Sequence, residues 1–326
     1  MRRGRRPAEL ALVATLIVLT VTLPLYIGSD FYLRVATLIC LFGVMALGWN
    51  LLGGYANQIS LGHAVYFAVG AYTTGLLEID RGITPWLGIP AGMALAALVS
   101  VAIGIPTFRL AGHYFTLGTL ALLQIGAILF TYYRQITGGP LGLTVPLLGD
   151  RPDMLSFKYP IWYFYLAAAL LAATLVVSRL VLHSRLGYRL RAIKGNPLAA
   201  QLAGVDLLRT KLVASAISGA IVAAGGGFYM QYIQFIDPDS AFAFQISINM
   251  ALFSVIGGVG VWWGPALGAL LLVPLGQYTS LQLTGRLAPV GPLLYGILLV
   301  VVILVRPRGL GEWIVSGWDR LWRARE

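Results

Sequence analysis

Residues 183–211, HSRLGYRLRAIKGNPLAAQLAGVDLLRTK, form a long basic and polar stretch in a chain that is otherwise almost wholly apolar. Ser184 is placed to cap a helix, and Gly195 is expected to end that helix in the left-handed conformation. The apolar residues between them recur at helical spacing: Leu186, Leu190 and Ile193. The first half of the stretch therefore predicts one short amphipathic helix.

The second half of the stretch predicts another short helix. Asn196 is a good cap residue, and Pro197 after it suits the first helical position because the N–H that proline lacks would be unpaired there anyway. Gly204 is placed to stop this helix. We therefore expect two helices joined at a corner, a form suited to docking on another protein.

The composition predicts a polytopic helical membrane protein. Of the 326 residues, 58% are hydrophobic and 11% are charged, and the mean hydropathy is +0.82, whereas about 25% charged residues is usual for soluble proteins. The net charge of +11 does not indicate nucleic-acid binding, because the basic residues cluster at the two ends and in 183–211, as they do in cytoplasmic loops. The lone Cys40 excludes an internal disulfide and a multi-cysteine metal site.

Uncharged runs of about 20 residues mark the membrane spans. Six of them hold one span each: 10–29, 82–108, 110–133, 159–178, 212–236 and 287–305. Two runs are long enough for two spans each, 35–77 and 240–285. The count predicts ten transmembrane helices in a single transmembrane domain over residues 1–326.

The positive-inside rule orients these spans. Four arginines among the first six residues place the N-terminus in the cytoplasm, and ten crossings return the basic C-terminus there. The same count places 183–211 in the cytoplasm between spans six and seven. It places two acidic loops outside, one with Asp150 and Asp153 and one with Asp237 and Asp239. The first run resembles a secretory signal but lacks a small-x-small cleavage site, so we interpret it as a retained helix. Residues 311–326 are predicted to be an amphipathic tail in the inner interface.

A glycine-rich segment, GGYANQISLGH at 53–63, divides the run 35–77. It forms either a cytoplasmic turn or a break in a helix at membrane depth, where freed backbone groups need protein or water partners. The polar side chains that would satisfy them or line a pathway are Asn57, Gln58, Ser60 and His63.

A second glycine cluster, GGVGVWWGPALG at 257–268, divides the run 240–285. Both clusters follow a Met-Ala-Leu, which is consistent with an internal duplication and equally with chance. In the span after 183–211, small residues recur every four positions and favour close helix packing within the chain: Ser215, Gly219, Ala223 and Gly227. Glu78 and Arg109 lie at ends of runs and are expected to snorkel to the interface.

Motifs for chemistry on this chain are missing from the sequence. It has no HExxH, no Gly-x-Ser-x-Gly, no P-loop and no acidic residue well inside a span. A transporter of this kind would take its energy from another polypeptide, and we expect no metal or cofactor on the chain. Two alternatives stay open: a membrane-embedded enzyme using His63 and His113, and an autonomous carrier.

Five segments together resemble the LivM-type permease subunits of bacterial ATP-binding-cassette importers for branched-chain amino acids, over about residues 35–308. They are GGYANQISLGHAVYFAVGAY (53–72), GHYFTLGTLALLQI (112–125), TGGPLGL (137–143), GYRLRAIKGNPLAAQLAGVDLLRTKLVASAISG (187–219) and IGGVGVWWGPALGA (256–269). The resemblance implies a transporter subunit rather than an enzyme, located in the bacterial inner membrane.

The resemblance also implies partners. They are a paralogous LivH-type permease, two cytoplasmic ATPases that hold ATP and Mg, an extracytoplasmic binding protein and membrane lipid. By the resemblance, 187–204 is the segment that couples to the ATPase. Its coupling residues are Arg191, Asn196, Pro197, Leu198, Ala199, Ala200, Leu202 and Gly204. Leu198 stands where the family has Glu, so a polar contact made by that Glu is in doubt.

The substrate is expected to be a branched-chain amino acid, and urea, short amides or other small polar solutes are the alternatives within the family. The side chains expected along the pathway are Asn57, Gln58, Ser60, His63, Gln124 and Asn249.

Overall fold

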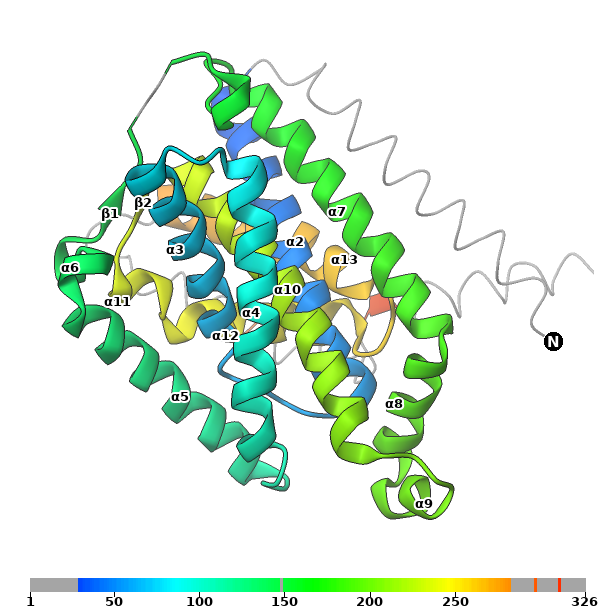
Figure 1. The fold of residues 1–326 in the computed structure, drawn as a ribbon. Helices are drawn as coiled ribbons and strands as arrows, with labels where there is room; N and C mark the ends of the chain where they lie inside the picture. The colour runs from blue at the N-terminus through cyan, green and yellow to red at the C-terminus, as the bar shows by residue number, and fades with distance from the viewer. Residues whose placement is uncertain (1–28, 147–148, 283–295, 298–309, 312–326) are drawn as a thin grey trace, which may run out of the picture.

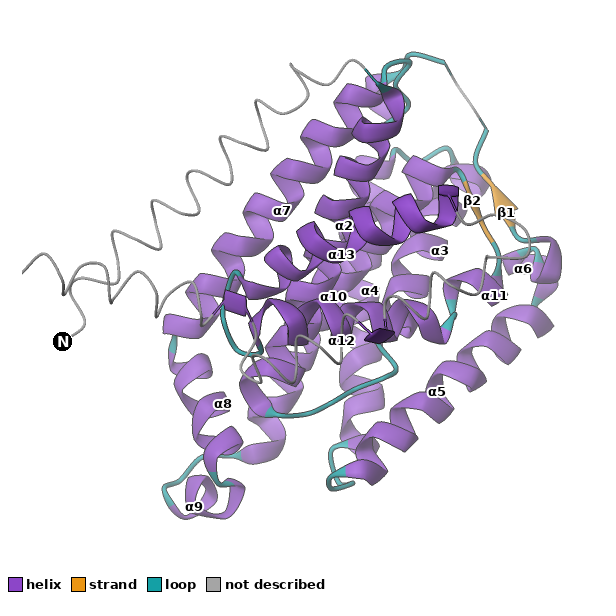
Figure 2. Cartoon of the chain, turned by 180° about the vertical axis from the view of Figure 1, so that it is seen from behind, coloured by secondary structure: helices purple, strands orange, loops and turns teal. Residues whose placement is uncertain are grey.

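The computed structural model describes residues 29–146, 149–282, 296–297 and 310–311, and in this part of the chain helices joined by loops account for the fold, with one pair of two-residue strands (Figures 1 and 2). Its long helices are α2 (Asp30–Ala56), α3 (Ala64–Arg81), α4 (Pro85–Thr107), α5 (His113–Tyr132), α7 (Pro160–His183), α10 (Leu207–Ile233), α12 (Phe244–Gly258) and α13 (Gly264–Gln282).

These helices stand where eight of the ten expected spans lie. By length and composition, six described stretches can cross a membrane: α2, α4, α5, α7, α10, and α11 with α12 over Pro238–Gly258. The chain is therefore a multi-pass membrane protein. The expected spans at 10–29 and 287–305 and the tail 311–326 lie almost entirely outside the described residues, so the count of ten stays a prediction.

Two long helices, α2 and α10, form the centre of the molecule (Figure 1). α10 packs against α2, α3 and α4, and α2 also packs against α7, α12 and α13. A Cβ added at Gly219 would lie 3.2 Å from the Ala96 carbonyl oxygen, and one at Gly227 would lie 2.6 Å from Thr74 Oγ1. The small-residue stripe of α10 thus packs within the chain, as expected, and lets α3 and α4 approach closely.

The two ends of the helix bundle carry different structures (Figure 1). One end carries the short helices α8 (Arg185–Gly195) and α9 (Pro197–Leu202). The opposite end carries α6 (Arg134–Thr137), η1 (Gly139–Leu141), η2 (Pro152–Met154), α11 (Pro238–Ala241), and the antiparallel strands β1 (Leu143–Thr144) and β2 (Phe235–Ile236). The acidic loops and the basic segment 183–211 therefore lie at opposite ends, as the topology predicts.

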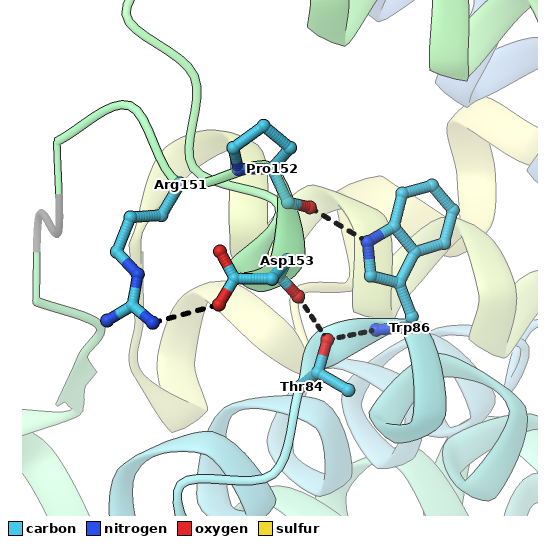
Figure 3. Close-up of polar contacts among 5 residues, drawn as sticks. All are labelled: Thr84, Trp86, Arg151, Pro152 and Asp153. Carbon is cyan, nitrogen blue, oxygen red and sulfur yellow. Dashed lines mark hydrogen bonds and ion pairs between the residues drawn. The ribbon is translucent and has the colours of Figure 1, made fainter.

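Hydrogen bonds attach η2 to the start of α4 (Figure 3). Trp86 Nε1 donates to the Pro152 carbonyl at 2.9 Å, and the Thr84 hydroxyl donates to the Asp153 carbonyl. Thr84 Oγ1 also accepts from Trp86 N and so caps α4. Arg151 and Asp153 form an exposed ion pair at 2.9 Å. The long connection between α5 and α7 is thereby held on the bundle.

Glu78 corrects one expectation. Its side chain does not snorkel outward but is buried, 5% exposed, and accepts a hydrogen bond from Gln231 Nε2 at 2.5 Å. The reason is that the last turns of α3 and α10 lie side by side, so the face of α3 that carries Glu78 meets α10 rather than the interface. The chain thus holds a buried carboxyl group near the outer end of a span.

Candidate functional site: a docking helix pair and two helix breaks

The helix α8 is fixed to the bundle as the sequence predicts. Ser184 Oγ caps it by accepting from Gly187 N at 3.4 Å. Leu190 and Ile193 are buried, and Leu190 packs with Leu51, Leu52 and Tyr55 at the end of α2. A Cβ at Gly187 would lie 2.3 Å from the Val181 carbonyl oxygen, so glycine permits the tight turn from α7 into α8.

The corner between α8 and α9 differs from the expectation at one residue. Gly195 does not end α8 in the left-handed conformation; it is the last helical residue, and the chain turns at Asn196, which is extended with φ −155°. The reason is that Asn196 already caps α9, accepting from Leu198 N and Ala199 N at 3.0 and 3.1 Å, and a cap residue requires extended backbone. Gly204 has φ +81° and ends α9, as predicted.

The helix α9 presents an apolar ridge to the outside. Ala200 is buried against the rest of the pair, whereas Leu198 and Leu202, four residues apart, are 67% and 83% exposed. Residues at this spacing lie on one helix face. Arg191 braces α8 by donating to the carbonyls of Leu182 and Gly187, both at 3.3 Å. We call Leu198 and Leu202 the α9 ridge.

Residues 57–63, the first break, separate α2 from α3 within the helix bundle. α2 ends at Ala56, and the cap residue Asn57 is left-handed with φ 55°. The chain then turns back into the protein, where Trp49 Nε1 donates to the Ser60 carbonyl at 2.7 Å. His63 is fully buried, and its two ring nitrogens lie 3.0 Å from Ser60 Oγ and from Ser218 Oγ in the middle of α10. α3 therefore starts inside the bundle beside the middle of α10, an arrangement that favours a break over a turn at the cytoplasmic end.

Partners far away in the sequence complete the first break. Ala64 N, in the first turn of α3, donates to Ser247 Oγ of α12 at 2.9 Å. Two threonines of α5 also bond the break: Leu61 N donates to Thr119 Oγ1, and Thr116 Oγ1 donates to the Ile59 carbonyl. The first break is thus held between α5, α10 and α12.

Residues 259–263, the second break, separate α12 from α13 and are also held by α2. Asn50 Nδ2 donates to the Val261 carbonyl and Asn50 Oδ1 accepts from Gly260 N, both at 3.0 Å. The glycine pair of α2 follows from these contacts. A Cβ at Gly53 would lie 2.3 Å from the Trp49 ring, and one at Gly54 would lie 1.9 Å from Asn50 Oδ1. Because both positions are glycine, the side chains of Trp49 and Asn50 can lie along the surface of α2 and reach the two breaks.

The expected pathway residues divide into two groups. Asn57 and Gln124 are exposed, Gln58 is partly exposed, and the half-buried Asn249 accepts from Gln245 Nε2 at 2.9 Å. Ser60 and His63 are buried and hydrogen-bonded within the protein. The first group lies on the outer surfaces of α5, the first break and α12, whereas the second group holds the break in place in this conformation.

Grouped metal ligands are absent from the described part of the chain, where no three His, Cys, Asp or Glu side chains converge. The hydrogen-bond partners of His63 in the described part of the chain are serine hydroxyl groups. This geometry offers the imidazole a positioning role, and it does not favour the enzyme alternative.

A family model described as the permease component of the branched-chain amino acid transport system matches residues 31–304. The chain belongs to this permease family. The permease is 31% identical over 324 residues to the high-affinity branched-chain amino acid transport permease LivM of Escherichia coli K12, with 93% of this chain and 74% of that protein covered.

More distant relatives carry other names. The LivH permease of Salmonella typhimurium is 24% identical, with 82% of this chain and 90% of that protein covered. The nucleoside ABC transporter permease NupC of Lactococcus lactis is 25% identical, with 73% and 78% covered. No solved structure matches the chain. The family resemblance seen in the sequence motifs is therefore confirmed, and the permease is a transporter subunit of the ABC type.

The residues that hold the breaks were not expected from the sequence: Trp49, Asn50, Ser218 and Ser247. One signal was present, because Trp49 and Asn50 stand four residues before Gly53 and Gly54, a spacing that places large polar side chains over glycines on a helix. The serines gave no such signal, since a lone serine in an apolar helix more often bonds its own backbone.

Proposed function

We propose that this permease lines half of a translocation pathway for branched-chain amino acids, and that ATPase subunits drive it through α8 and α9. The α9 ridge carries the proposal. Two leucines at 67% and 83% exposure stand at the tip of a helix pair whose other face is packed on α2, at the end of the bundle that the positive-inside rule predicts to be cytoplasmic.

The ridge fits a groove on a soluble partner because an apolar helix face at i, i+4 spacing is a common docking element. α8 continues from α7 and α9 leads into α10 over Ala203–Asp206, so a push on the ridge reaches two spans directly. ATP and Mg would be held by two such ATPases, and this chain would bind no cofactor. Leu198, where the family has Glu, makes this contact apolar.

The pathway is proposed to follow the outer faces of α5, the first break and α12. Neutral amide groups lie there on Asn57, Gln58, Gln124 and Asn249, beside the exposed Ile59. Amides can hydrogen-bond both the ammonium and the carboxylate of a zwitterion, and apolar neighbours suit a branched side chain. A paralogous LivH-type permease would close the open side, and an extracytoplasmic binding protein would deliver substrate at the end that carries β1 and β2.

The decisive experiment combines purification with uptake. Affinity purification of the permease from its native bacterial inner membrane should recover a second permease and ATPases, and the reconstituted assembly should take up radiolabelled leucine only with internal ATP. Competition by valine and isoleucine, without competition by urea, acetamide or guanosine, supports the branched-chain class. Recovery of the chain alone, or uptake without ATP, would refute the ABC assignment; competition by an amide or a nucleoside would reassign the substrate.

A further inference from the structure

Lys194 lies in the last turn of α8 and makes a polar contact from the α8–α9 helix pair to α2 at the centre of the bundle. Its Nζ donates to the Gly54 carbonyl in the last turn of α2 at 2.8 Å. α8 also packs on α2 through Leu190, which belongs to one apolar cluster with Leu51, Leu52 and Tyr55. Partial burial of the amine lowers the pKa of Lys194. The residue as a whole is exposed, and its amine lies against the end of α2.

The C-terminal end of α2 has carbonyl groups without intrahelical partners, and Lys194 donates to one of them. The last four carbonyls of a helix have no intrahelical partner, and a cation there is favoured by the helix dipole. α2 has no basic residue of its own in its last turn. Lys194 supplies the missing cation from a helix 140 residues further along the chain.

Lys194 also lies beside the second break. A Cβ built on Gly260 would lie 3.5 Å from Lys194 Nζ and 3.3 Å from the Gly54 carbonyl oxygen. Gly260 is the residue whose N–H donates to Asn50 Oδ1, and its φ of +84° is available to glycine but strained for other residues. One small volume therefore holds the tip of α8, the end of α2 and the second break.

We propose that Lys194 is a positioning residue that couples movement of α8 and α9 to the break between α12 and α13. When a partner displaces the α9 ridge, α8 moves with it, and the Lys194–Gly54 bond transfers that displacement to the end of α2 and so to the Asn50-bound second break. This inference rests on the proposed function, because it needs a partner that pushes on α9. It adds which residue carries the movement onward and where the movement arrives.

Three variants of the whole reconstituted transporter test the link. Lys194→Met keeps the aliphatic length but removes the charge and the donors, Lys194→Arg restores both, and Arg189→Met is the matched control, an exposed basic residue on the same helix. Leucine taken up per ATP hydrolysed should fall about tenfold in Lys194→Met, because the charged donor to the Gly54 carbonyl is lost. It should recover in part in Lys194→Arg and stay at the wild-type value in Arg189→Met.

A second measurement reads the movement itself. Val259 is 36% exposed at the second break, and the native Cys40 is buried, so Val259→Cys offers a selective site for a maleimide. Its labelling rate should change between the ATP-free and the vanadate-trapped transporter, and Lys194→Met should abolish that change. The labelling rate is measured on those transporters that have assembled, so it can be determined even where the variant assembles poorly.

The two proposals fail differently. If the wild-type assembly does not transport leucine, the proposed substrate fails. If it does, and Lys194→Met keeps the wild-type uptake per ATP or the wild-type change in labelling, the coupling role of Lys194 is refuted.

Discussion

Replacing Gly70 with alanine should separate the two helices on which the first break depends. A Cβ at this position of α3 would lie 2.1 Å from the Ala223 carbonyl oxygen of α10, and backbone cannot swing away as a side chain can. Cβ contacts below 3.0 Å essentially never occur, so α3 and α10 must move apart by about 0.9 Å, the difference between the two distances. Gly226 of α10, whose Cβ would lie 2.1 Å from the Phe67 carbonyl oxygen, shows that this crossing is tight from both sides.

This separation has a cost that can be worked from the contacts. Overpacking costs about 1–3 kcal/mol. A shift of the same size would stretch the 3.0 Å contact between His63 Nε2 and Ser218 Oγ beyond hydrogen-bond range, which adds about 1 kcal/mol. We expect Gly70→Ala to lose about 2–4 kcal/mol of folding free energy and to transport poorly.

The assay is the thermal midpoint of the purified transporter together with ATP-driven uptake. Gly195→Ala is the matched control, because Gly195 is helical with nothing within 4 Å of its added Cβ. Alanine there should leave the midpoint unchanged or raise it slightly. An unchanged midpoint and uptake in Gly70→Ala would show that α3 and α10 are not packed as described.

Three further predictions concern the docking pair and the first break. Trp49→Phe removes the donor to the first break but leaves an aromatic ring there, and should lower the thermal midpoint by the equivalent of about 1–3 kcal/mol; an unchanged midpoint contradicts the buried bond. Leu202→Glu should abolish co-purification of the ATPase while Gln201→Glu, an exposed neighbour on α9, should not, and equal recovery would reject the ridge as the docking surface. Asn57→Ala and Gln58→Ala should change the KM for uptake while subunits still assemble, and unaltered kinetics would leave these amides a structural role only.

The parts of the fold that depend on local chemistry were predictable. Ser184, Asn196 and Gly204 act where helix-capping rules place them, because a cap involves only a few adjacent residues. The long apolar runs also became helices at the expected places, since the cost of unpaired backbone in lipid leaves few alternatives.

The features that depend on distant partners were not predictable from one sequence. Glu78 looked like an interfacial residue because its burial comes from α10, and Gly195 looked like a helix terminator because the role of Asn196 in the next helix outweighs it. Sequence spacing likewise cannot show that Lys194 reaches Gly54. The candidate site was thus found in outline, through its polar residues, whereas the contacts that hold it required the structure.

The contact between Ser247 and the first turn of α3 has a consequence for biogenesis. The acceptor is synthesised 183 residues after the amide that it satisfies, which at ribosomal speed is a delay on the order of ten to forty seconds. During that interval α3 sits in the bilayer or its insertion machinery with an open amide at its inner end. Newly made chains truncated before α12 should therefore be prime targets for membrane quality-control proteases.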